Sequence, residues 1–184
     1  YRNDTAFRAP VLRGGDAVTL FVCVPALIVT AFLYRRGSLR GGLLLVGLLS
    51  YFLYNAASLA FGAAYNELLL VYIASFSTSL FAFVLAYQSI DLGALKARTS
   101  ATLPHRWVAV FVFVAGLSVV VWLMDIVAAL TQGTVPANLD AYHTEATAVL
   151  DLGLIPPTAY LAGVLAWRRR PLGTLLGTTM ITLN

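Results

Sequence analysis

The chain has 184 residues, of which 60% are hydrophobic and 11% charged, and its mean hydropathy is +0.84. Soluble domains usually carry about 25% charged residues, so most of this surface is expected to face lipid. The net charge of +4 therefore does not indicate a nucleic-acid partner, because basic residues of a membrane protein set its orientation and contact lipid headgroups.

Long apolar runs predict the helices in chain order. A membrane-spanning helix needs about 20 apolar residues, and the first five runs are long enough. The sixth would form about 20 Å of helix, too short for a hydrocarbon core of about 30 Å. We expect it to be partial, or truncated with the natural chain continuing past Asn184. The predicted spans are residues 17–34, 42–62, 68–88, 107–130, 146–167 and 172–184. They predict an all-α, polytopic transmembrane helix bundle that forms one domain over residues 1–184.

Charged residues are sorted between the two ends of these runs. Seven of the eight acidic residues lie at or near one end, and only Asp91 lies with the basic clusters. Nine of the twelve basic residues form three clusters after the first, third and fifth spans: Arg35, Arg36 and Arg40; Lys96, Arg98 and Arg106; Arg168, Arg169 and Arg170. This positive-inside pattern predicts a cytoplasmic (inner) membrane location, with basic loops in the cytoplasm and the N-terminus outside.

Four spans carry a polar residue at a similar predicted depth. Asp125 and Asp151 lie about five residues from the outer ends of the fourth and fifth spans, and Asn55 and Ser75 lie about seven residues from those of the second and third. At about 1.5 Å per residue, all four lie roughly 8–10 Å below the outer surface. Polar groups in a bilayer usually pair or line a wet cavity, so these positions predict an outward-facing polar vestibule.

Helical periodicity adds three neighbours to this set. Tyr54 shares a stripe with Asn55, Tyr72 shares one with Ser75, and Thr158 lies beyond Asp151 on one side of the fifth span. The Pro156-Pro157 pair removes two backbone donors, and free carbonyls beside a carboxylate suit a cation or proton site. The alternative is ordinary packing, in which small residues permit close approach and hydroxyls bond across helices. The candidate substrate or ion site comprises Asp151, Asp125, Asn55, Tyr54, Ser75, Tyr72 and Thr158.

An outer loop contains Asp140, His143 and Glu145 in a D-x-x-H-x-E spacing. These side chains are possible metal ligands. However, the P-C-x-x-C segment that accompanies His-x-Glu in zinc deaminases is absent from the sequence. A polar loop that caps the fifth helix is the alternative, since acidic groups favour a helix start. We therefore expect no metal, with these three residues as the weak candidates.

Several cofactor classes are excluded by single residues. Lys96 is the only lysine and lies in a loop, which excludes a retinal Schiff base. His105 and His143 both lie outside the predicted spans, so one chain cannot hold a bis-histidine haem within the membrane. Cys23 is the only cysteine, which excludes a CxxC redox pair. The sequence also has no G-x-x-x-x-G-K-[ST] motif for nucleotide phosphates. We expect no cofactor.

Three segments resemble an uncharacterised group of bacterial multi-pass membrane proteins. They are residues 54–83 (YNAASLAFGAAYNELLLVYIASFSTSLFAF), residues 150–157 (LDLGLIPP) and residues 167–173 (WRRRPLG). The resemblance implies the same multi-pass topology and a bacterial cytoplasmic membrane. It implies no activity and transfers no site residue.

Three functions remain open from the sequence. The first is transport of a small solute, a cation or protons through the polar vestibule. The second is an accessory or assembly subunit of a larger membrane complex, with Gly, Ser and Ala faces that suit helix partners or a homo-oligomer. The third is a membrane-embedded enzyme at the outer face that uses Asp151, Asp140, His143 or Glu145 as acid and base. Because no diagnostic catalytic set is present, the catalytic residues are unknown and a non-enzymatic role is favoured.

Overall fold

The structure of the chain is a computed structural model that describes residues 1, 3–6, 8–99, 104–118, 121–136, 139 and 142–183. These residues contain helices and no β-strand, which confirms the predicted all-α class. The elements are α1 (Arg8–Val18), the π-helical η1 (Thr19–Cys23), α2 (Val24–Arg35), α3 (Leu39–Gly62), α4 (Leu69–Gln88), α5 (Leu92–Arg98), α6 (His105–Ser118), α7 (Val121–Gln132), α8 (Ala146–Trp167) and α9 (Pro171–Leu183).

Within the described residues, five helical segments are long and apolar enough to cross a membrane, as predicted. They are Arg8–Arg35, which joins α1, η1 and α2; Leu39–Gly62; Leu69–Gln88; His105–Gln132, which covers α6 and α7 with residues 119–120 between them outside the described part of the chain; and Ala146–Trp167. The first differs most from its prediction, because helix begins at Arg8 instead of residue 17. Thr5 supports that early start, since its side-chain Oγ1 accepts a hydrogen bond from the Arg8 N–H at 3.2 Å.

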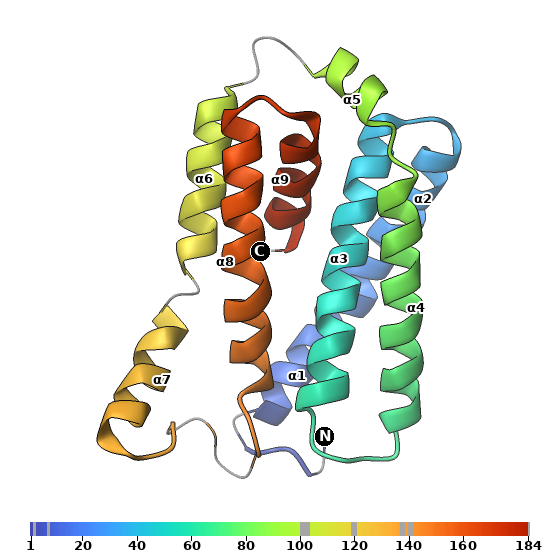
Figure 1. Cartoon of the computed structure of the whole chain (residues 1–184). Coiled ribbons are helices and arrows are strands. Elements are labelled where there is room, and N and C mark those ends of the chain that lie inside the picture. The colour runs from blue at the N-terminus through green and yellow to red at the C-terminus, as the bar shows by residue number, and fades with distance from the viewer. Residues whose placement is uncertain are drawn as a thin grey trace.

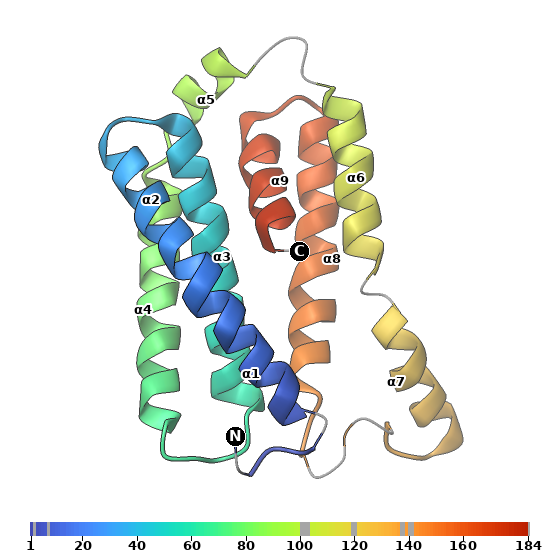
Figure 2. The same ribbon diagram turned by 180° about the vertical axis from the view of Figure 1, so that it is seen from behind.

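The helices form a bundle whose two ends differ (Figures 1 and 2). The α2–α3 turn, α5 and the α8–α9 turn lie at one end, which we call the α5 end. The N-terminus, the α3–α4 connection and the start of α8 lie at the other, which we call the N-terminal end. The three basic clusters belong to the elements of the α5 end. The three basic clusters, which are far apart in the sequence, therefore lie at the same end of the folded bundle.

Helix α9 packs against both α3 and α8 in the half of the bundle nearest α5 (Figure 1). It contributes Leu175 to one buried cluster, with Val46 of α3 and Leu95 of α5. It contributes Met180 to a second, with Val112 of α6 and Ala162 of α8. This short helix therefore joins the two sides of the bundle at the α5 end.

Among the glycines that the structure describes, Gly173 at the start of α9 lies closest to a neighbouring backbone. A Cβ added to Gly173 would lie 2.2 Å from the Ala166 backbone nitrogen and 2.4 Å from the Leu165 carbonyl carbon. Real Cβ atoms do not approach backbone so closely, so only glycine lets α9 turn back against α8.

Helix α7, in contrast, packs loosely. It leans away from the bundle (Figures 1 and 2), and Ala129 is its buried residue.

The contact at Gly173 predicts that Gly173→Ala lowers the free energy of unfolding by about 2 kcal/mol, the typical cost of overpacking. The matched control is Gly153→Ala in α8, where an added Cβ meets nothing within 4 Å. That control is expected to be neutral or slightly stabilising because alanine favours a helix over glycine. Denaturant unfolding in one detergent measures both variants. Equal stability of the two would contradict the packing.

Candidate functional site

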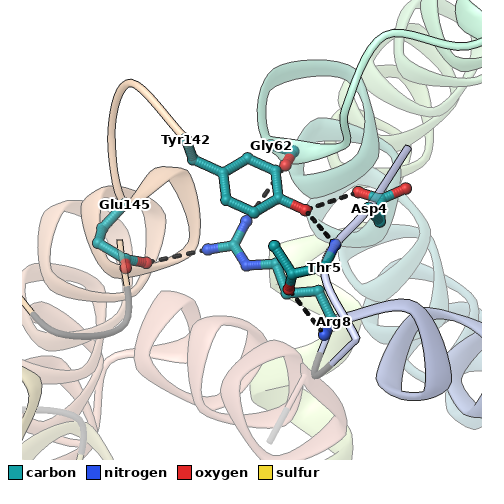
Figure 3. Close-up of polar contacts among 6 residues, drawn as sticks. All are labelled: Asp4, Thr5, Arg8, Gly62, Tyr142 and Glu145. Carbon is teal, nitrogen blue, oxygen red and sulfur yellow. Dashed lines mark hydrogen bonds and ion pairs between the residues drawn. The ribbon is translucent and has the colours of Figure 1, made fainter. Parts of the chain in front are cut away.

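Polar side chains gather at the N-terminal end around Arg8 (Figure 3). The Arg8 Nη2 lies 2.9 Å from Oε2 of Glu145, at the start of α8, and Nη1 donates to the Gly62 carbonyl at 3.2 Å, at the end of α3. The guanidinium also lies 4.2 Å from the centre of the Tyr142 ring. One cation of α1 thus contacts an anion, a carbonyl and an aromatic face from two other segments.

Asp4 and Tyr142 extend these contacts. The Tyr142 hydroxyl donates to Asp4 Oδ1 at 2.8 Å, and the Ala64 N–H donates to the same oxygen at 3.0 Å. The Thr5 N–H donates to the Tyr142 hydroxyl at 3.4 Å. We call Asp4, Thr5, Arg8, Gly62, Tyr142 and Glu145 the Arg8 network (Figure 3). It ties the N-terminal segment to the end of α3 and the start of α8.

Two carboxylate oxygens of this network remain without a partner within the described part of the chain. They are the buried Oδ2 of Asp4 and Oε1 of Glu145. An unsatisfied buried carboxylate oxygen is costly, so each is a place where water or a ligand would gain a hydrogen bond.

Asp151 lies further along α8 and faces α3, where the Tyr54 hydroxyl donates a hydrogen bond to its Oδ1. Asp151 also lines a cavity of about 330 Å³ with Arg8 and Glu145. Val11 of α1, Trp122 of α7, and Thr147 and Ala148 of α8 complete the lining of this Asp151 cavity. The cavity therefore combines one ion pair, one further carboxylate and an indole ring.

A second polar contact forms beside it between η1 and α3. The Thr19 Oγ1 lies 2.8 Å from the Tyr51 hydroxyl, and Asn55 Nδ2 donates to the same Thr19 oxygen at 3.5 Å. Pro25 explains the wider helical turn at η1, because its ring disfavours the usual α-helical approach to the Phe21 carbonyl. Thr19, which contacts α3, is thus the first residue of the π-helical turn in the first span.

The structure brings some of the predicted site residues together and separates others. Tyr54 and Asp151 are in direct contact, whereas Asn55 faces Thr19. Tyr72 is buried at the start of α4, where its hydroxyl lies 3.4 Å from Asn66 Nδ2. Thr158 is half-buried on α8, and Ser75 and Asp125 are exposed on α4 and α7. Thr158, Ser75 and Asp125 do not line the Asp151 cavity.

Of the three residues considered as metal ligands, the structure describes His143 and Glu145. His143 is exposed, Glu145 pairs with Arg8, and Asp140 lies outside the described residues. Over the described ranges there is no group of three or more His, Cys, Asp or Glu side chains arranged to hold a metal ion.

Sequence reasoning missed Arg8, Asp4, Tyr142 and Thr19. A signal for Arg8 was present, because it is a basic residue on the acidic side of the predicted topology. Such an exception to the charge pattern indicates a specific partner. Thr19 carried no comparable signal, since its role depends on the π-helical turn.

No protein-family model, curated protein or solved structure matches this chain.

The Tyr142 contact predicts a pH-dependent stability. Burial and the hydrogen bond to Asp4 raise the pKa of Tyr142 above its ordinary value, against the opposing effect of Arg8. The folded state then holds the phenolic proton more strongly than the unfolded state. The stabilisation is complete below about pH 10 and is lost as the pH rises further.

Tyr142→Phe keeps the ring beside Arg8 but removes the hydroxyl, so we expect a loss of about 1 kcal/mol at neutral pH. The stability difference between wild type and variant should shrink above about pH 10. Thermal unfolding of both proteins from about pH 8 to pH 11 measures that difference. The other titrating groups are the same in both proteins, so their effects on stability cancel. A difference that is independent of pH would contradict the assignment.

Proposed function

We propose that this is a multi-pass protein of a bacterial inner membrane, with its N-terminal end outside, and that the Asp151 cavity binds a small organic cation for transport. Two observations support the orientation and the membrane. Five helices have the length and composition of membrane spans, and the basic clusters belong to the elements of the α5 end. Cytoplasmic loops of inner-membrane proteins carry such an excess of Lys and Arg.

The observation that carries the solute proposal is the charge balance of the Asp151 cavity. Arg8 is paired with Glu145 at 2.9 Å, so the two charges offset each other. The carboxylate of Asp151 has the Tyr54 hydroxyl as a hydrogen-bond donor but no cationic side chain within 4.0 Å in the described residues. A carboxylate inside a span costs about 2.5–3.5 kcal/mol at the bilayer centre and less at the depth of Asp151, and a bound cation would offset that cost.

The rest of the lining favours an organic cation over a metal ion. Trp122 supplies an indole face, which attracts ammonium groups by a cation–π interaction. Val11 and Ala148 supply apolar wall, which suits the carbon atoms of an alkylammonium ion. A volume of about 330 Å³ lies at the small end of ligand pockets, which span roughly 300–1,000 Å³.

Asp151→Asn is expected to abolish this binding, because it removes the charge and keeps the shape. Tetramethylammonium, used as the probe, should raise the melting temperature of the wild-type protein in nanodiscs and leave that of Asp151→Asn unchanged. Asp125→Asn is the matched control and should behave as wild type, since it removes an exposed carboxylate of α7 outside the cavity.

Trp122→Ala should weaken tetramethylammonium binding about fivefold, the equivalent of a cation–π contact of about 1 kcal/mol. Uptake of labelled tetramethylammonium into proteoliposomes then tests transport itself. Equal thermal shifts in wild type and Asp151→Asn would overturn the cation site. Binding without uptake would overturn transport.

A second function, an accessory subunit of a larger complex, is favoured by α7. Asp125 is exposed and is the one charged residue of α7, a largely apolar helix that leans away from the bundle. A charge facing lipid is costly, and a partner helix that donates hydrogen bonds would remove that cost.

This alternative predicts that other chains co-purify stoichiometrically from native membranes in mild detergent, as identified by mass spectrometry. Asp125→Leu should release them, whereas Asp151→Asn should not. Recovery of this chain alone, or as a homo-oligomer, would contradict the accessory role.

A further inference from the structure

A second cavity lies at the α5 end, between the start of α3, α5 and α9, and has a volume of about 570 Å³. Two arginines from separate elements line it. Arg40 lies in the first turn of α3 and Arg98 in the last turn of α5. We call this the Arg40–Arg98 cavity. Between Arg40 and Arg98 the chain runs through the rest of α3, all of α4 and most of α5. The two side chains therefore meet at one cavity because of the fold, not because they are close in sequence.

Both arginines are available to an external anion. Their side chains are exposed, and within the described part of the chain the one ion pair is that of Arg8 with Glu145. Asp91 is the acidic residue closest to Arg98 in sequence, but its Oδ1 accepts hydrogen bonds from the Gly93 and Ala94 N–H groups at the start of α5. The cavity therefore has two positive charges without an internal counter-ion.

The lining combines polar and apolar side chains. Ser38 contributes a hydroxyl whose oxygen accepts from the Gly41 N–H at 3.1 Å, which leaves its proton to donate. Thr174 contributes a second hydroxyl from α9. Leu39, Leu43 and Leu95 also line the cavity, and Leu95 is only 3% exposed. An inorganic anion would gain no favourable contact from the leucine side chains. A phospholipid, in contrast, joins its phosphate to glycerol and acyl groups, which can contact them.

Aromatic residues mark the depth of the cavity in a membrane. Trp107 at the start of α6 is 75% exposed, and Trp167 at the end of α8 has the Arg106 guanidinium 5.5 Å from its ring centre. Both helix ends belong to the α5 end (Figure 1). Exposed tryptophans concentrate at the level of lipid headgroups, so the cavity lies where phosphate groups are present.

We propose that the Arg40–Arg98 cavity binds the phosphate group of an anionic phospholipid. The two guanidinium groups hold the phosphate oxygens through charge-assisted hydrogen bonds, and the Ser38 hydroxyl donates a further one. The leucines contact the glycerol and the first carbons of the acyl chains. This site is independent of the Asp151 cavity, which involves other helices and the opposite end of the bundle.

Native mass spectrometry of the full chain in detergent, with phosphatidylglycerol or phosphatidylcholine added, tests the proposal. We expect wild type to retain phosphatidylglycerol in preference to phosphatidylcholine. Arg40→Gln/Arg98→Gln should retain about tenfold less phosphatidylglycerol. Arg36→Gln is the matched control, because Arg36 is an arginine of the same end that lies over the Phe32 ring and outside the cavity lining. It should retain phosphatidylglycerol as wild type does.

Arg40→Lys/Arg98→Lys separates loss of binding from loss of folding, since it keeps both charges and should recover most of the retention. Retention of phosphatidylglycerol by the double glutamine variant at the wild-type level would overturn the site. A separate arm adds inorganic phosphate at millimolar concentration. If inorganic phosphate displaced the lipid completely, or stabilised the protein when phosphatidylglycerol was not retained, the lipid assignment would be overturned in favour of a soluble phosphate compound.

Discussion

Arg8 connects three segments that lie far apart in the chain, and the polar half of the molecule depends on it. Its contacts with Glu145, Gly62 and Tyr142 fix the start of the first span against the end of α3 and the start of α8. A guanidinium at a membrane boundary is stabilised by acceptors for its donors, and this network supplies one acceptor to Nη1 and one to Nη2 from two other segments. The position of α1 in turn forms one wall of the Asp151 cavity.

The two halves of the bundle are stabilised differently. At the α5 end, α9 fills the space between α3 and α8 with Leu175 and Met180, and packing is apolar. At the N-terminal end, α3 and α8 meet through the Tyr54–Asp151 hydrogen bond, and η1 meets α3 through Thr19. Close apolar packing favours rigidity, whereas a polar seam beside a cavity leaves a place for a solute. The proposed solute site lies in the polar half.

The helices were largely predictable because a bilayer requires long apolar runs, and the runs are visible in the sequence. Site geometry was predictable only in part. Depth in the membrane follows from residue number, but the direction of a side chain depends on how each helix is rotated and packed. Asp125 and Asp151 have similar predicted depths, yet Asp125 is exposed on α7 while Asp151 faces Tyr54. The first span was predicted to begin at residue 17, nine residues late, because Arg13, Gly14, Gly15 and Asp16 interrupt the apolar pattern.

The central claim is that the Asp151 cavity opens to the outer aqueous side and holds a cation. The most direct test introduces Thr147→Cys, a residue of the cavity lining, into a Cys23→Ser background. A membrane-impermeant maleimide is then added to intact cells with and without tetramethylammonium. The account predicts labelling from outside that tetramethylammonium slows. Labelling only after the membrane is permeabilised, or labelling that tetramethylammonium does not affect, would contradict it.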